Sequence, residues 1–191
     1  AQKIPYVLSG GQSFFERSEI KDLTSYLRLL ANQDDDPAFI RAVTTPKRGI
    51  GGGTLEALGR AAGRRHQSLF AAIFAPGVGE ELGARPHALL KEFADFINRI
   101  EYRAGREPAG QLLADLLRAI GYEASLFATL DPKEAEAKWG NVRDFTDWLA
   151  LLPNAQVLGL STGIGSGFNG SFRGAVDNVS FTVSGATTTY N

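Results

Sequence analysis

The sequence predicts a mainly α-helical domain with a short strand near its N-terminus and a β-rich tail at its C-terminus. Hydrophobic residues make up 43% and charged residues 21% of the 191 residues, which is ordinary for a globular protein that buries a core. Apolar residues recur at helical spacing from residue 18 to residue 152. After Pro153 the only charged residues are Arg173 and Asp177, and the apolar pattern becomes alternating, which is typical of strands.

The N-terminal segment is expected to form a short strand followed by two helices. Residues 4–8 are β-forming and stop at a glycine turn, so they predict the strand. Ser18 is expected to cap a helix that ends around Asn32. Asp36 and Pro37 open a second helix. It ends at Thr45, because a residue that precedes proline is disfavoured in helical backbone.

Four or five further helices are expected before residue 153, which makes six or seven in all. A third opens at Thr54, and a short one follows Ser68. After Pro86 the apolar spacing is i, i+1, i+4, i+7, i+8, i+11, the pattern of an amphipathic helix. Pro108 opens another, which Gly121 ends as a left-handed cap. Residues 122–130 add a turn or two. The last helix follows a capping sequence, Asp131-Pro132-Lys133-Glu134, in which Glu134 is expected to reach back.

The tail has the alternation of a strand and the glycines of hairpin turns. Val179, Phe181 and Val183 fall on one face of residues 172–183. Because an isolated hairpin is marginally stable, the tail is expected to need a surface to cover.

Composition excludes several classes of function. Twenty Lys and Arg against 21 Asp and Glu give a net charge of -1, so nucleic acid could be bound only through a local patch. The sequence has no Cys and two separated His, which argues against disulfides and metal sites. It also lacks the phosphate loop, the hydrolase elbow and the zinc-peptidase motif. No catalytic residue and no cofactor of its own are therefore expected.

Location and processing are also expectations from composition. No apolar run is long enough to span a bilayer, and the first residues do not suit a signal peptide, so a cytoplasmic protein without membrane contact is expected. The absence of Met suggests an excised or processed piece. Residues 163–167 have the glycine spacing of a dinucleotide site but lack the flanking strand and helix.

The strongest local signal is Thr45-Pro46-Lys47-Arg48-Gly49-Ile50-Gly51-Gly52-Gly53-Thr54, between two predicted helices. Glycines let backbone amides at the start of a helix approach a phosphate closely, and Lys47 and Arg48 supply cations. Such a site would bind the duplex backbone without reading sequence. The alternative is a plain interhelical turn with a solvated Lys-Arg pair. Arg60, Arg64, Arg65 and His66 either extend this patch or form a solvated helix face.

A longer set of residues resembles a known family. The segment from Ile4 to Asp22, then Tyr26-Leu27-Arg28, Asn32, Asp34-Asp35-Asp36 and Thr45-Pro46-Lys47-Arg48-Gly49-Ile50-Gly51, is similar in order and spacing to superfamily 1 DNA helicases of the UvrD/Rep/PcrA group. The later helices, through Asn141-Val142-Arg143-Asp144-Phe145, look like the helical insertion of the same family.

The resemblance implies a division of the chain and a set of partners. Residues 1–45 would be part of the second motor lobe (2A) of an ATP-driven 3′ to 5′ DNA translocase, and 46–152 its 2B insertion. Residues 153–191 would be a Gly/Ser/Thr-rich tail of uncertain origin. ATP and Mg²⁺ would belong to the parent motor and not to this chain. The implied partners are double-stranded or junction DNA and the rest of the motor.

The resemblance also assigns site residues. The family's duplex contact falls on Gly49, Ile50 and Gly51, with Thr45, Lys47, Arg48, Gly52 and Thr54 beside them. Gly11, Phe15 and Arg17 would lie near the track for single-stranded DNA.

Two other functions remain open from the sequence. Residues 170–181 resemble the closing strands of exported β-sandwich domains, so the tail could be a binding module with the helices as its scaffold. Alternatively, the helices fold but bind nothing.

Overall fold

The computed structural model describes residues 14–150, 160–162, 179–183 and 186–190. This part is mainly helical, as predicted. Its helical elements are η1 (Phe14–Glu16, a 3-10 turn), α1 (Ser18–Ala31), α2 (Asp36–Thr44), α3 (Gly52–Arg65), α4 (Leu69–Ala72), α5 (Val78–Leu82), α6 (Ala84–Ala104), α7 (Ala109–Ile120), α8 (Tyr122–Thr129) and α9 (Pro132–Ala150). Strands β1 (Leu160–Thr162), β2 (Val179–Val183) and β3 (Ala186–Tyr190) pair antiparallel in that order. The strand expected at residues 4–8 and most of the tail lie outside the described residues.

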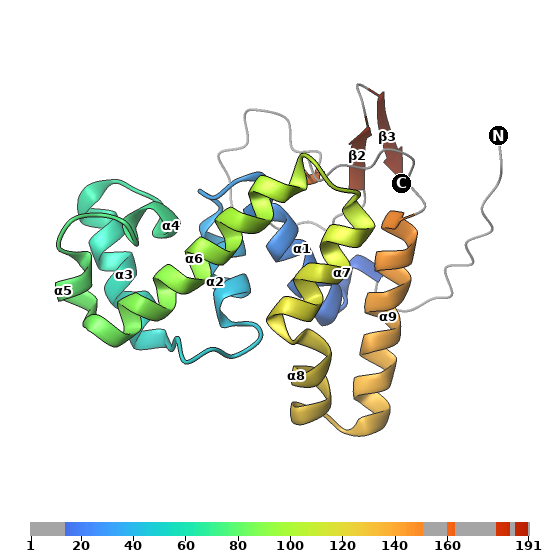
Figure 1. Cartoon of the computed structure of the whole chain (residues 1–191), viewed down its shortest axis with the longest axis horizontal. Helices are drawn as coiled ribbons and strands as arrows, with labels where there is room; N and C mark the ends of the chain where they lie inside the picture. The colour runs from blue at the N-terminus through green and yellow to red at the C-terminus, as the bar shows by residue number, and fades with distance from the viewer. Residues whose placement is uncertain (1–13, 151–159, 163–178, 184–185, 191) are drawn as a thin grey trace.

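Helix α6 crosses the helical part and connects its two ends (Figure 1). At one end, α3 packs against α4 and α5, and α5 contacts the start of α6. At the other, α1 packs against α2, α6 and α9, while α7 lies between α6 and α9. Residues near the start of the chain are therefore held by helices more than 60 residues further along it.

The core is one continuous cluster of buried side chains. Phe93 of α6 lies edge-on to Tyr26 of α1 and Phe39 of α2, with ring centroids 6.4 and 5.9 Å away. The same cluster extends from Ile20 to Leu149. Burial of these side chains is the main favourable term for folding, so the packing joins the two parts that the sequence divides at residues 45 and 46.

Most helices begin and end where the sequence predicts. Helix α6 buries the periodic apolar positions expected after Pro86. Helix α7 follows Pro108 and ends at Gly121, whose φ of 64° is the predicted left-handed cap. Ser68 caps α4 by accepting a hydrogen bond from the Ala71 amide.

Three local expectations are wrong. Ser18 is the first residue of α1 instead of its cap, and its hydroxyl donates to Glu19 Oε2 at 3.1 Å. Glu134 does not reach back, because its carboxylate pairs with Lys138 one turn further along α9 at 3.1 Å. Helix α3 begins at Gly52, two residues before Thr54, since Gly52 and Gly53 already adopt helical backbone there. Helix α5 has no counterpart in the sequence analysis.

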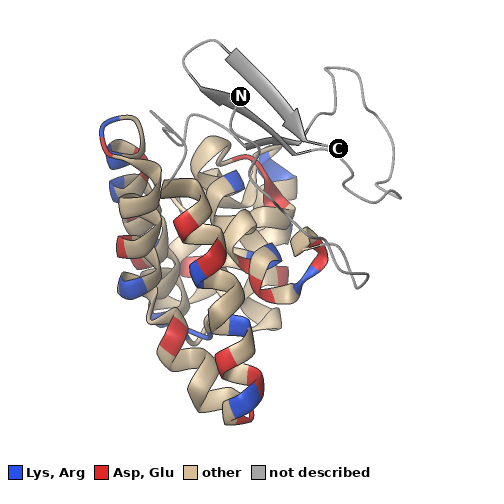
Figure 2. Cartoon of the chain, turned by 90° about the vertical axis from the view of Figure 1, so that its right-hand side faces the viewer, with Lys and Arg blue, Asp and Glu red and all other residues tan. Residues whose placement is uncertain are grey.

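Acidic and basic residues are intermixed over the helices (Figure 2). No helix in the described part of the chain is long and apolar enough to cross a bilayer. Within those same residues there is no group of three or more His, Asp or Glu that could hold a metal ion.

Helices α7 and α9 approach each other closely at Gly110. A Cβ atom at this position would lie 2.6 Å from Ala150 Cβ and 2.8 Å from Ala150 Cα, distances that force a backbone to move. Gly140, in the middle of α9, has nothing within 4 Å of the same imaginary atom.

We expect Gly110→Ala to lower the free energy of unfolding by about 1–3 kcal/mol, because the added methyl overpacks the contact between the helices. Gly140→Ala is the matched control, and it should raise the free energy of unfolding by about 0.5–1 kcal/mol, because alanine loses less backbone entropy in a helix. Urea denaturation followed by circular dichroism measures both. Equal stabilisation by the two variants would contradict the close approach.

Candidate functional site

The glycine-rich segment forms an exposed turn between α2 and α3. Thr45 follows the last residue of α2 and precedes a cis bond to Pro46. Gly49 has a φ of +79°, a region that favours glycine. Ile50, 8% exposed, is the side chain that anchors the turn in the core. Ile50 is therefore one of the contacts that hold the turn on the core.

The start of α3 presents backbone amides to open space. Gly51 precedes α3, and its carbonyl accepts from the amides of Thr54 and Leu55 at 3.1 and 3.2 Å. The amides of Gly52 and Gly53 have no partner among the described residues, and no side chain caps the helix. All three glycines are exposed, and a Cβ on any of them would meet nothing within 4 Å. Free amides at the positive end of a helix dipole can bind an anion.

Arg48 points inward and holds the turn in place. Its Nη2 donates to the Tyr26 hydroxyl at 2.6 Å, and its Nε donates to the Pro46 carbonyl at 3.2 Å. The guanidinium also lies over the Phe93 ring, 4.8 Å from its centroid. Lys47, by contrast, is exposed and has no ion-pair partner in the described part of the chain. The two adjacent cations expected at the turn therefore have different roles: Arg48 stabilises the turn, whereas Lys47 is exposed to solvent.

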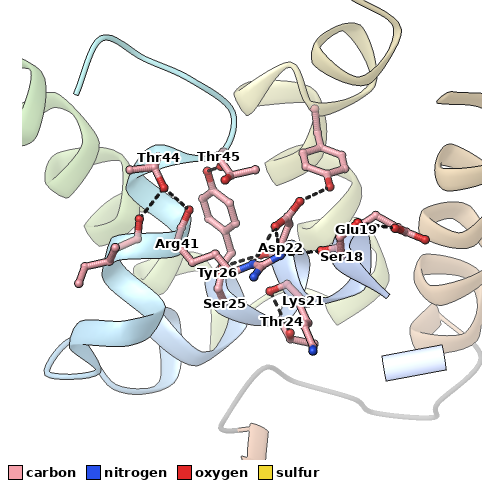
Figure 3. Close-up of polar contacts among 12 residues, drawn as sticks. Ser18, Glu19, Lys21, Asp22, Thr24, Ser25, Tyr26, Arg41, Thr44 and Thr45 are labelled. Carbon is pink, nitrogen blue, oxygen red and sulfur yellow. Dashed lines mark hydrogen bonds and ion pairs between the residues drawn. The ribbon is translucent and has the colours of Figure 1, made fainter. Parts of the chain in front are cut away.

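Tyr26 connects α1 to the same turn. Its hydroxyl lies 2.8 Å from the Ala42 carbonyl oxygen and 2.6 Å from that of Thr45, so it donates to the end of α2 while accepting from Arg48. Figure 3 shows Tyr26 directed from α1 toward Thr45. Burial raises the pKa of Tyr26 to about 12, although the positive charge and hydrogen bond of Arg48 act to lower it. The hydroxyl therefore stays protonated, as this donor role requires.

Gly49 packs closely against α6. A Cβ atom at Gly49 would lie 3.4 Å from Leu89 Cδ1, and the positive φ would strain any other residue there. Ile50 and Gly49 together set the turn on the core through side-chain burial and close backbone approach.

The arginines of α3 do not all extend this surface. Arg60 is exposed, with no ion pair in the described residues. Arg64 pairs with Glu81 of α5, as does Arg65 at 2.8 Å. The hydrogen bond from Arg65 is the largest cause of the lowered pKa of Glu81. Arg64 lies twelve residues along α3 from Gly52, about 18 Å from the free amides at 1.5 Å per residue. His66 ends the helix in left-handed backbone, with a φ of 51°.

The residues expected near a single-strand track are engaged in internal contacts. The Phe15 ring lies edge-on to Phe14 and to Phe145 of α9, with centroids 5.6 and 6.3 Å away. Arg17 donates to Asn141 and lies 5.5 Å from the Phe14 ring centroid. Gly11 lies outside the described residues. Thr45 and Thr54 are half-buried at the two ends of the turn.

A polar network on α1 is a feature that the sequence analysis missed. Glu19, only 4% exposed, accepts from Asn141 Nδ2 of α9 at 2.7 Å. Asp22 accepts from the Tyr122 hydroxyl at 2.6 Å and from Arg41 Nε at 2.8 Å. Burial and the negative charge of Asp22 raise the pKa of Tyr122. Figure 3 shows Asp22 of α1 directed toward Arg41 of α2. The partners Asp22 and Tyr122 are 100 residues apart, and Glu19 and Asn141 are 122 apart, so these contacts leave no signal in local spacing.

The raised pKa of Tyr26 predicts a loss of stability at high pH. A native pKa above the unfolded value means that the stabilising contribution is complete below about pH 10 and declines as pH rises through about 12. Between about pH 9 and pH 11, the free energy of unfolding should therefore fall by about 1.4 kcal/mol more in the unmodified chain than in Tyr26→Phe. Denaturation curves across this range measure the difference. Parallel pH profiles would contradict it, and the contribution of Tyr122 cancels because both chains contain it.

Comparison with known proteins places these residues in a family. The UvrD-like helicase C-terminal domain family matches residues 1–75. The chain is 46% identical over 148 residues to the ATP-dependent DNA helicase Rep of Salmonella typhimurium and 45% identical over 148 residues to that of Escherichia coli. Each match covers 77% of this chain and 22% of the relative. DNA helicase II of Escherichia coli is 40% identical over 105 residues, which are 55% of this chain and 15% of that protein.

These relatives show the parentage of the helices but not the activity of a whole enzyme. The chain spans 22% of the length of each Rep protein that it matches. The residues that the family matches, 1–75, contain α1 and the turn. The chain belongs to the UvrD/Rep family of superfamily 1 DNA helicases.

Proposed function

We propose that this chain carries the part of an ATP-dependent DNA helicase that contacts the backbone of duplex DNA. The turn at residues 45–51 and the first residues of α3 would lie against the phosphates. The two Rep relatives are named ATP-dependent DNA helicases, which supports DNA as the ligand. In this proposal, residues 1–45 belong to the second motor lobe, 46–152 to the 2B insertion, and 153–191 to a separate β-rich tail.

The observation that carries the proposal is the row of free amides beside an unpaired lysine. The amides of Gly52 and Gly53 have no partner among the described residues, these glycines are exposed, and Lys47 is an exposed lysine of the turn that leads to them. A phosphate oxygen accepts hydrogen bonds from such amides and is attracted by the lysine, whatever base it carries. The contact would therefore be independent of sequence.

The charge distribution favours a small contact instead of a broad one. Acidic and basic residues are intermixed over the helices (Figure 2), and the net charge is -1, so the long-range electrostatic field of the protein is weak. Arg64 and Arg65 share the single carboxylate of Glu81, which offsets one of their two positive charges. Only a few phosphates would be bound, and the affinity of this chain alone would be modest and sensitive to salt.

The motor chemistry would come from elsewhere in the helicase. The described residues offer no cluster of acidic groups for Mg²⁺, and the sequence has no phosphate loop for ATP. Both groups would be bound by parts of the motor that this chain does not contain. The chain's own role would be to position the duplex, with the motor and junction DNA as its partners in the cytoplasm.

The charge of Lys47 provides one test of the proposed contact. We expect Lys47→Ala to weaken binding to a blunt duplex and to reduce the slope of log affinity against log salt by about 1, because one fewer counterion is released. Lys133→Ala is the matched control, since Lys133 is an exposed lysine at the start of α9 and belongs neither to the turn nor to α3. Fluorescence anisotropy with labelled DNA from about 50 to 200 mM salt measures both. Identical slopes for the two variants would count against the proposed contact.

A substitution at Gly52 tests the contribution of the backbone amides separately from that of the lysine charge. Gly52 is the first residue of α3, a position that suits proline, and the extended backbone of Gly51 (φ -104°, ψ 176°) suits a residue before proline. Gly52→Pro therefore removes one free N–H without disturbing the helix. We expect about tenfold weaker duplex binding, the value of a charge-assisted hydrogen bond.

Gly52→Ala is the control for this change. It keeps the N–H, and its methyl group meets open space, so duplex affinity should stay within about twofold of the unmodified chain. Thermal unfolding should show that both variants remain folded. If proline and alanine had the same effect on affinity, the amide would not be the contact.

A further inference from the structure

A groove of about 450 Å³ lies beside the turn. Three elements line it, namely residues 46–48, one face of α6 and the end of α7. The residues from α6 follow the spacing of a single helix face, and they are Leu89, Glu92, Phe93, Phe96 and Arg99. At about 1.5 Å per residue, this face is about 15 Å long, which matches about five residues of extended backbone. The groove therefore has the length of a short peptide segment.

One part of the groove is positively charged. Lys47, Arg48 and Arg99 line it, and Glu92 is the single carboxylate among the lining residues. Lys47 and Arg99 are exposed and have no ion-pair partner among the described residues. Nε and Nη2 of Arg48 hold its guanidinium in place, while its Nη1 has no hydrogen-bond partner in the described part of the chain. One fixed guanidinium and two mobile cations together favour a ligand with more than one anionic group.

Another part of the groove is apolar. Leu89, Phe96 and Ile120 line it and are half-buried, so each leaves part of its side chain accessible. Aromatic residues and arginine are enriched in the surfaces through which proteins bind one another. A ligand that covers these side chains must carry apolar groups as well as negative charge.

A duplex does not match both parts of the groove. Its outer surface consists of phosphates and sugars, so it would leave the apolar side chains uncovered, as inorganic phosphate would. An acidic peptide segment that also contains leucine or phenylalanine matches both parts. Its carboxylates pair with the arginines, and its apolar side chains pack against α6.

We propose that the groove binds an acidic segment of a partner protein, with carboxylates at Arg48 and Arg99 and a large apolar side chain against Leu89 and Phe96. Lys47 lines the groove and also belongs to the turn, so the bound segment and a phosphate at the turn compete for one ammonium group. The segment therefore weakens duplex binding, and the duplex weakens binding of the segment by the same factor. This competition rests on the proposed function, whereas binding of the segment does not.

The test uses the full chain and a labelled synthetic peptide in which one phenylalanine and one leucine stand among glutamates. Control peptides separate the two kinds of contact, with serine in place of both apolar residues or glutamine in place of the glutamates. In fluorescence anisotropy, each control should bind at least about tenfold more weakly than the parent peptide, because it loses either apolar burial or charge-assisted hydrogen bonds. Equal affinity of the parent and either control would overturn the proposal.

Arg99→Gln tests the groove itself. Arg99 is exposed and makes no ion pair in the described residues, so its replacement should leave the fold intact. The parent peptide should bind about tenfold more weakly, the value of a charge-assisted hydrogen bond. Affinity for a blunt duplex should stay within about twofold, because Arg99 does not belong to the turn and exposed charges are screened beyond about 8 Å at physiological salt. Equal weakening of peptide and duplex would make the groove part of the duplex contact and overturn the proposal.

Lys91→Gln is the matched control. Lys91 is an exposed residue of the same helix, it does not line the groove, and the change in total charge is identical. This variant should keep the affinity of the unmodified chain for the peptide. Equal weakening of peptide binding in both variants would attribute the effect to net charge and overturn the proposal.

Competition between the ligands separates this inference from the proposed function. The unlabelled parent peptide should displace a labelled blunt duplex, and this displacement should need about tenfold more peptide in Arg99→Gln but not in Lys91→Gln. A peptide that binds through Arg99 while the duplex stays bound would overturn the competition. If no duplex binds in a salt-sensitive way, the proposed function fails, and the peptide titrations alone decide what the groove binds.

A crosslink locates the peptide. Benzoylphenylalanine in place of the phenylalanine of the peptide should crosslink to the α6 segment that contains Phe96, and the crosslink should disappear in Arg99→Gln. Crosslinks confined to other helices would contradict the assignment. A single-stranded oligonucleotide that displaces the peptide and itself loses affinity in Arg99→Gln would assign the groove to nucleic acid and overturn the proposal.

Discussion

The geometry of the turn depends on the interaction between the Arg48 guanidinium and the Tyr26 hydroxyl. One hydroxyl lies within reach of the carbonyl oxygens of Ala42 and Thr45 and accepts from Arg48 at 2.6 Å. It therefore satisfies groups at the end of α2 that the helix itself leaves unpaired. Because Phe93 packs under the guanidinium, the same contact joins α1, the turn and α6. Loss of either partner would leave a polar group in the interior with too few hydrogen bonds.

This interaction explains why adjacent cations have different roles. Arg48 is held by three elements, so it cannot follow a phosphate that approaches from solvent. Lys47 has a compact charge on a flexible stem and no competing partner in the described residues, which suits a mobile contact with a backbone phosphate. Arginine suits the inward position because its planar group donates in fixed directions and stacks on a ring. If both cations were replaced together, weaker DNA binding could therefore result either from a lost DNA contact or from a distorted turn.

Sequence patterns predicted the features that depend on local chemistry. The apolar spacing of α6 and the left-handed glycine at position 121 were sufficient to predict α6 and the end of α7. Both features depend only on residues close together in the sequence. Helix α5 was missed because it has five residues and buries only Val78, which is too short for a period. The prediction that Ser18 caps α1 was wrong. A serine before a helix usually caps it, whereas here the helix begins at Ser18 itself and Arg17 occupies the cap position. The site was predicted as a segment, but pairing such as that of Arg64 with Glu81 depends on how α3 packs against α5.

The division of the chain at residues 45 and 46 is a prediction from resemblance, and the packing adds a physical constraint to it. Tyr26 and Phe93 lie on opposite sides of that division in sequence, yet they share one core. The contacts of Glu19 with Asn141 and of Asp22 with Tyr122 cross it as well. Water can replace these polar contacts at modest cost, but separating Tyr26 from Phe93 would expose apolar surface and break the turn. A movement of residues 46–152 that preserves the geometry of the turn must therefore carry α1 and α2 with it.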